Sequence, residues 1–114
     1  MKMNQFVMLF ILLAVCSLVL AEQQVQNQKP DAVYTYKHVE DVELKLNVYF
    51  PPDHKVTDKR PAIVFYFGGG WTSGNMDHFK RQSLRLAQLG MVAITPDYRT
   101  KKRHGTPPFD CVAD

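Results

Sequence analysis

The feature that most constrains the fold is an apolar and aromatic run that ends in three consecutive glycines and a tryptophan. Residues 62–67 (AIVFYF) lack the apolar and polar alternation of a half-exposed strand, so we predict a strand buried on both faces. The three glycines that follow allow backbone conformations closed to other residues and remove side chains that would keep a ligand away. Such a loop is expected where bare N–H groups approach a phosphate or the oxyanion of a reacting ester.

The N-terminal 21 residues have the features of a secretory signal peptide. Lys2 supplies a positive start, residues 6–20 form an apolar run broken only by Ser17, and small or compact residues precede a cleavage site after Ala21. The run is short for a membrane span, so we predict cleavage there, a secreted or periplasmic protein, and no stable membrane anchor. An uncleaved membrane-anchoring helix is the alternative.

The remaining chain divides into a short linker and one domain. Residues 22–32 are polar and glutamine-rich, which is typical of a linker, and residues 33–114 carry the apolar patterning. The formal net charge is +3, or +2 without Lys2, which is too weak to indicate nucleic acid binding. Only Cys111 would survive cleavage, so it is predicted either as a small buried residue opening a helix or as a partner for a cysteine outside this chain. No cofactor or metal site is expected.

The patterning of the domain predicts two antiparallel strands followed by a strand–helix–strand unit. The helix is expected to begin near Asp77 and to end before Gly90, and proline and glycine punctuate the connections. A basic loop from Tyr98 to Pro108 then leads to the first turn of another helix. The predicted strands are residues 33–39, 43–50, 62–67 and 91–95.

This order defines an α/β fold with a mixed sheet in which the last two strands are parallel. One helix would leave one face of a four-stranded sheet bare, which a domain of this hydrophobicity should not tolerate. The sequence therefore predicts the N-terminal portion of a longer protein.

Two readings of the glycine loop are open from the residues alone. Gly68, Gly70 and Ser73 approximate a dinucleotide-binding fingerprint, with Asp97 near the place of a ribose-binding acid. However, two strands precede the glycine strand, and Trp71 would crowd a pyrophosphate. The second reading is an oxyanion hole, in which preorganised N–H groups stabilise the negative oxygen formed during acyl transfer. This reading also explains the tryptophan, which can wall an acyl pocket.

The order strand, Gly-Gly-Gly-Trp, helix, and a strand ending in Thr95-Pro-Asp-Tyr-Arg99 resembles the N-terminal third of an α/β-hydrolase-fold esterase. The nearest groups are hormone-sensitive-lipase-like esterases and bacterial acetylxylan or feruloyl carbohydrate esterases. Residues 47–52 (NVYFPP) are also similar to the second strand of those families. The likeness covers roughly Tyr34 to Asp114. One departure is Phe67, which stands where those families carry a loop-supporting histidine.

The resemblance implies a role for each residue of the loop. Gly69 and Gly70 would supply the oxyanion N–H groups with Trp71 beside them. The residues predicted to support the loops are Phe67, Gly68, Asp97 and Arg99. Asp97 comes too early in the chain to be the triad acid, so we expect it to stabilise the loop after the fourth strand by pairing with Arg99.

The resemblance also implies a Ser-His-Asp triad, which no residue of this chain fits. The family's nucleophile lies on a G-x-S-x-G turn, and neither Ser73 nor Ser83 has the flanking glycines. The triad is therefore expected after Asp114. The expected function is that of a secreted serine hydrolase of small-molecule or polysaccharide esters, such as acetyl or feruloyl groups on carbohydrates. A secreted peptidase of the same fold and a noncatalytic hydrolase-like binding protein are the alternatives.

Overall fold

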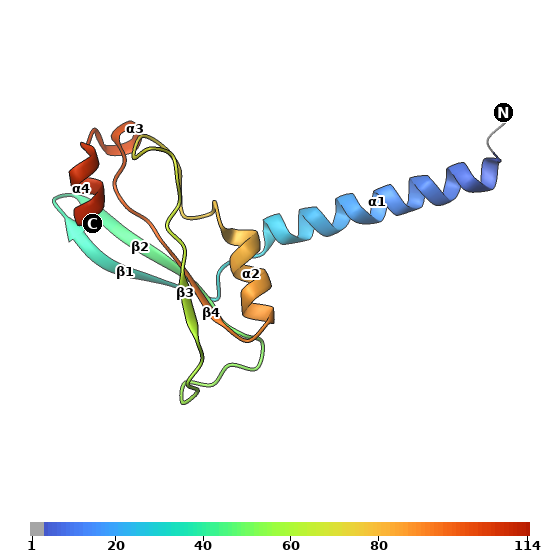
Figure 1. Cartoon of the computed structure of the whole chain (residues 1–114), viewed down its shortest axis with the longest axis horizontal. Coiled ribbons are helices and arrows are strands. Elements are labelled where there is room, and N and C mark those ends of the chain that lie inside the picture. The colour runs from blue at the N-terminus through green and yellow to red at the C-terminus, as the bar shows by residue number, and fades with distance from the viewer. Residues whose placement is uncertain (1–3) are drawn as a thin grey trace.

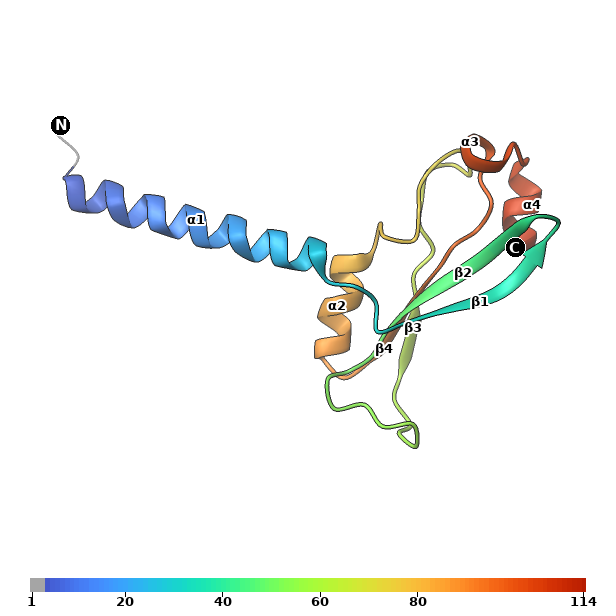
Figure 2. The same cartoon turned by 180° about the vertical axis from the view of Figure 1, so that it is seen from behind.

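The structure, a computed structural model, describes residues 4–114 (Figure 1). An N-terminal helix leads into a small α/β domain, in which one helix lies against a four-stranded sheet and two short helices lie near one end of it (Figure 2). The strands are β1 Ala32–Val39, β2 Val42–Tyr49, β3 Ala62–Val64 and β4 Val92–Pro96, and the helices are α1 Gln5–Asn27, α2 Lys80–Gln88, α3 Lys101–His104 and α4 Pro108–Ala113.

The sheet has the strand order β1-β2-β4-β3. β2 pairs antiparallel with both β1 and β4, whereas β3 and β4 are parallel. The predicted α/β fold with antiparallel lead-in strands and a parallel β3–α2–β4 unit is therefore confirmed. A register shift between Thr35 and Lys37 leaves Tyr36 unpaired on β1. Such bulges re-aim a side chain, and this one occurs beside the candidate site.

The core lies between the sheet and α2. It is formed by Tyr49 from β2, Ala93 from β4, and Leu84 and Ala87 from α2, with Ile63 of β3 packed against it. Helical spacing brings Leu84 and Ala87 to one face of α2, where both are buried.

The helix ends as expected but begins later than expected. Gly90 adopts a φ of 94° and donates to the carbonyl of Ala87, which closes the last turn. α2 begins at Lys80 rather than near Asp77, because the Asn75 side chain accepts the backbone N–H of Asp77 at 2.9 Å and its carbonyl accepts that of His78. These bonds form a turn that competes with the helix.

The predicted burial of residues 62–67 on both faces is wrong. β3 ends at Val64 and is the last strand of the sheet on its side, although the Phe65 N–H still donates to Ile94. Val64 and Tyr66 are 45% and 67% exposed, because no element among residues 4–114 covers the sheet face opposite α2 at this edge. Phe67 is the exception, at 4% exposure.

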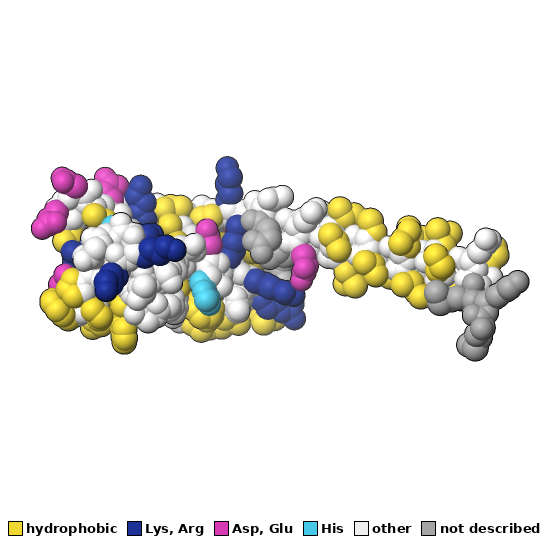
Figure 3. Space-filling view, turned by 90° about the horizontal axis from the view of Figure 1, so that it is seen from above, with side chains coloured by type: hydrophobic (Ala, Val, Ile, Leu, Met, Phe, Trp, Pro, Cys, Tyr) yellow, Lys and Arg dark blue, Asp and Glu magenta, His cyan; other side chains and the backbone are white. Residues whose placement is uncertain are grey.

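The N-terminal helix is longer than its apolar run. α1 extends away from the domain and shows apolar side chains along its length (Figure 3), and it continues to Asn27, so part of the predicted linker is helical. Glutamine and glutamate are favourable helix residues, which explains the extension. Residues 5–24 are long and apolar enough to cross a membrane, a property that signal sequences share. The helix is thus compatible with either a signal peptide or an anchor.

The segment after β4 is more ordered than the predicted loop. It contains the single helical turn α3, which ends at Gly105 with a φ of 70° and a bond from its N–H to the Lys101 carbonyl. The predicted C-terminal helix is present as α4, with Pro108 in its first turn.

Candidate functional site

The glycine loop is a tight turn at the carboxyl end of β3. Gly70 and Trp71, with φ of 57° and 59°, are its two central residues, and the Thr72 N–H closes it by donating to the Gly69 carbonyl at 3.0 Å. Two positive φ values in succession are typical of a type I′ turn. Trp71 is not a glycine, so its conformation costs on the order of 1–3 kcal/mol and must be held by its surroundings.

Two glycines are required by close contacts rather than by conformation alone. A Cβ on Gly69, whose φ is 133°, would lie 2.2 Å from the backbone oxygen of Ser73. A Cβ on Gly74 would lie 2.5 Å from the ring of Phe67 and 2.6 Å from the Gly68 carbonyl oxygen. In contrast, a Cβ on Gly70 would meet nothing within 4 Å. The turn is therefore closed by packing on one side and open on the other.

The open side borders a cavity of about 450 Å³. Within the part of the chain that the structure describes, the N–H groups of Gly69, Gly70 and Trp71 donate no hydrogen bond. Free donors beside a cavity suit an anionic or developing anionic oxygen. The cavity is lined mostly by aromatic and glycine residues: Tyr36, Tyr66, Phe67, Gly68, Gly69, Gly70, Trp71, Tyr98, Cys111, Val112 and Asp114.

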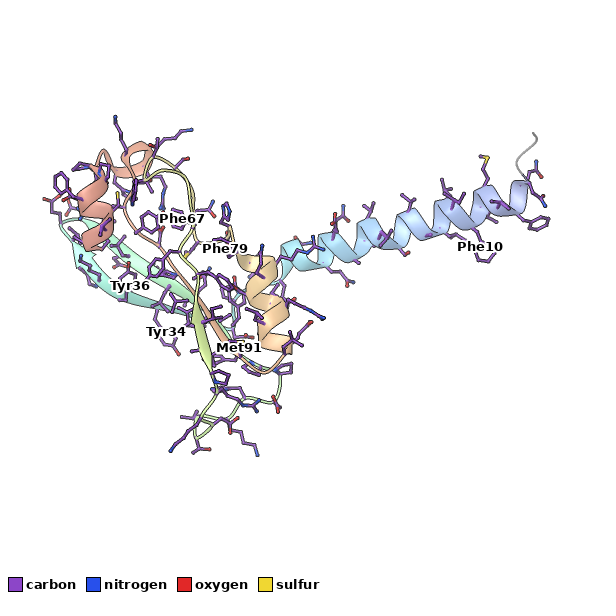
Figure 4. The ribbon with its side chains drawn as sticks, in the orientation of Figure 1. Phe10, Tyr34, Tyr36, Phe67, Phe79 and Met91 are labelled. Carbon is purple, nitrogen blue, oxygen red and sulfur yellow. The ribbon has the colours of Figure 1, made fainter. Side chains whose placement is uncertain are left out.

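Phe67 forms the base of the loop by stacking on Tyr98. The two rings lie 4.0 Å apart at 7°, and the Tyr98 hydroxyl donates to the Phe67 carbonyl at 2.5 Å. Figure 4 labels Phe67 between the glycine loop and the segment that follows β4. Cys111 of α4 completes this buried cluster, in agreement with its predicted place as a small buried residue opening a helix. A ring stack with one hydrogen bond thus supports the loop at the position where the resembled families carry a histidine.

Asp97 does not pair with Arg99, so that predicted contact is wrong. Both carboxylate oxygens of Asp97 accept from Arg103, at 2.9 and 2.6 Å. Arg99 instead binds Asp114 through its backbone N–H and its guanidinium. Arg103 rather than Arg99 pairs with Asp97 because the turn of α3 folds the Arg103 side chain back toward Asp97 at the end of β4. Both oxygens of Asp97 are thus engaged by a guanidinium within the domain, and Oδ1 also accepts the Tyr98 N–H, which counts against the dinucleotide reading.

Asp114 ties α4 to both β1 and the segment after β4. Its side chain is fully buried, and it accepts from Arg99 and from the Lys37 ammonium at 3.2 Å. Burial raises the pKa of this carboxyl, but the hydrogen bonds from Arg99 and Lys37 outweigh it and bring the pKa below the ordinary 3.8. The sequence showed Asp114 only as the end of a short helix and Arg103 only as one of a run of basic residues. No spacing rule links either to its partner.

Tyr36, at the bulge in β1, also lines the cavity and contacts the segment after β4. Its hydroxyl donates to the Asp97 carbonyl at 2.5 Å, and Figure 4 labels it on that side of the domain. Burial, followed by the charges of Asp114 and Asp97, raises the pKa of Tyr36 to about 12. It is therefore a neutral hydroxyl at ordinary pH. Among the described residues, no group of three or more histidine, cysteine, aspartate or glutamate side chains could hold a metal ion.

Comparison with known proteins identifies the class of this fold. The structure superposes on esterase 2 of Thermogutta terrifontis with bound propionate at a TM-score of 0.70, with 51% identity over 73% of this chain and 30% of that one. The same esterase phosphonylated by cyclosarin gives a TM-score of 0.71, with 49% identity over 76% of this chain and 33% of that one. No family model matches the sequence.

A curated relative agrees with the structural match. Carboxylesterase NlhH of Mycobacterium tuberculosis is 32% identical over 66 residues, which are 57% of this chain and 20% of that protein. The predicted resemblance is confirmed: the chain is similar in sequence and fold to part of α/β-hydrolase esterases. It spans about a third or less of the length of the proteins it matches.

Proposed function

We propose that the whole protein to which this chain belongs is a serine hydrolase of carboxylic esters, with the glycine loop as its oxyanion hole. The observation that carries the proposal is the set of free N–H groups on Gly69, Gly70 and Trp71 beside an aromatic-lined cavity. Each such donor is worth about 2.7–4 kcal/mol of transition-state stabilisation in acyl transfer. The similar esterases, one of which is phosphonylated by cyclosarin, support the same class of reaction.

In this proposal the chain contributes electrostatic stabilisation and the substrate-facing wall, and a Ser-His-Asp triad follows Asp114 in the sequence. The serine would attack the ester carbonyl while its proton passes to the histidine, and the carbonyl oxygen, now negative, would accept from the loop. Trp71, which is 47% exposed, would wall the acyl side. The apolar N-terminal helix supports export by a signal peptide, and acetyl or feruloyl groups on carbohydrates are the proposed substrates.

The test is to express the whole protein and measure turnover of 4-nitrophenyl acetate, methyl ferulate and acetylated xylan. A fluorophosphonate probe, followed by mass spectrometry, should label one serine on a G-x-S-x-G turn. Residues 22–114 alone are the negative control and should show no turnover above background. Cleavage of peptide amides without ester turnover would favour the peptidase, and absence of both labelling and turnover would favour a binding protein.

A further inference from the structure

The strained turn at Trp71 is held from outside the loop. The Trp71 carbonyl accepts the N–H of Lys101 at 3.0 Å, and the Thr72 carbonyl accepts the N–H of Lys102 at 2.9 Å. These donors are the first two N–H groups of α3, which a helix leaves without internal partners. The peptide groups that follow Trp71 and Thr72, on the C-terminal side of the positive φ values, are thus fixed by the start of α3.

A single helical turn does not persist without tertiary support. The support for α3 is the Arg103 side chain, which folds back over the segment that leads into the helix. Its two terminal nitrogens bind both carboxylate oxygens of Asp97, one of them also donates to the Tyr98 carbonyl at 2.9 Å, and Nε reaches the Thr100 hydroxyl at 3.4 Å. The guanidinium carbon also lies 5.8 Å from the centre of the Phe67 ring. One side chain therefore joins both ends of the 97–103 segment to the base of the loop.

We infer that Arg103 is the positioning residue of the glycine loop: it locks α3, and α3 holds Trp71 and Thr72 so that the free N–H groups keep their place beside the cavity. Arg103 does not line the cavity, and Asp97 neutralises its charge, so it acts through the backbone rather than by attracting the substrate oxygen. The inference rests on the proposed function, because the loop's geometry matters only if an oxyanion forms there.

The closing experiment compares Arg103→Gln and Arg103→Lys with Arg81→Gln in the whole protein. Arg81 is 77% exposed on α2 and serves as the matched control. A displacement of about 1 Å in a catalytic group can cost roughly 100-fold, so Arg103→Gln should lower kcat for 4-nitrophenyl butyrate by about 10- to 100-fold with KM within about twofold. Arg103→Lys keeps the charge but loses the two-pronged contact, so it should remain impaired. The inhibition constant of a trifluoromethyl ketone, which forms the tetrahedral oxyanion, should rise by the same factor as kcat/KM falls.

A second readout separates this inference from the proposed function. Hydrogen–deuterium exchange of the peptide that spans residues 68–74 should accelerate in the Arg103 variants and not in Arg81→Gln. An active wild-type protein whose Arg103 variants keep kcat within twofold, or lose affinity for substrate alone, would overturn the inference and leave the proposed function intact. A wild-type protein without ester turnover would overturn the proposed function, and unchanged exchange in the loop would then overturn the inference as well. Should Arg103→Gln fail to fold, Arg103→Lys decides the outcome by the same measurements.

Discussion

The α2-covered side of the sheet and the loops at the carboxyl ends of β3 and β4 are stabilised by different forces. Between α2 and the sheet, Tyr49, Leu84, Ala87 and Ala93 bury apolar surface against one another. At the carboxyl ends, backbone hydrogen bonds from α3 reach a turn that is strained at Trp71, and ion pairs of Arg99 with Asp114 and of Arg103 with Asp97 fix the segment around α3. The first region depends on the area removed from water, and the second on the direction of a few polar contacts.

The difference predicts that stability and activity respond to different mutations. Apolar burial is non-directional, so a loss on the α2 side lowers the free energy of unfolding without moving the loop. A loss of directional contacts at the loop should instead lower kcat more than it lowers the free energy of unfolding. A small displacement of a hydrogen-bond donor matters more to a transition state than to folding. In the whole protein, variants of the two regions should therefore differ in whether kcat or the free energy of unfolding changes.

The largest effect is expected from Gly69→Ala. The new Cβ would lie 2.2 Å from the Ser73 backbone oxygen, which no flexible group can relieve, so the turn must open. If the loop is the oxyanion hole, kcat should fall about 100-fold or more, comparable to the loss of a whole donor. Gly70→Ala is the comparison variant: its Cβ meets no atom within 4 Å, so the turn can stay closed, and strain at a φ of 57° with one methyl group at the cavity should lower kcat less. Equal losses in the two variants would contradict the packing argument.

Leu84→Ala should destabilise the fold and leave catalysis unchanged. Leu84 is 9% exposed within the core, and the loss of a buried leucine costs about 2–5 kcal/mol. Chemical denaturation should show this loss, with kcat within about twofold of the wild type. Leu89→Ala, at a residue 64% exposed just after α2, is the control and should change the free energy of unfolding little. A large fall in kcat for Leu84→Ala at a temperature where the variant is folded would mean that the two regions are coupled.

The same contrast explains what could be predicted from the sequence. Apolar periodicity and glycine or proline punctuation predicted the strands, α2 and the parallel β3–β4 pair, because these signals are local. The loop's supports were predicted poorly, since Asp97 pairs with Arg103 and Arg99 with Asp114 through geometry that no spacing expresses. The error over residues 62–67 is similar: an apolar run predicted burial, whereas the exposure of β3 depends on what else lies against it. The motif located the glycine loop itself, whereas the contacts of Arg103 and Asp114 around it are visible only in the structure.

The smallest effect is expected from Asp114→Asn, and it should depend on pH. The folded-state pKa of Asp114 lies below the ordinary 3.8, so between these two values the unfolded chain binds more protons than the folded one. The contribution of Asp114 is therefore present above pH 3.8 and is lost as the pH falls through the folded-state pKa. Asparagine keeps the shape but not the charge that Arg99 and Lys37 bind. The melting temperature of the variant should thus lie several degrees below that of the wild type at pH 7, and the gap should close in acid.

Asp53→Asn is the matched control, because the Asp53 side chain is 74% exposed and pairs with Arg60 in solvent. Exposed pairs contribute little and are screened by salt. The difference in melting temperature between Asp53→Asn and the wild type at pH 7 should therefore be smaller, and it should shrink further in high salt. The gap for Asp114→Asn should resist salt, because its carboxylate is buried. A pH-independent gap for Asp114→Asn would mean that the side chain acts through shape and packing. The loops at the carboxyl ends of β3 and β4 would then be stabilised by packing, as the α2-covered side of the sheet is.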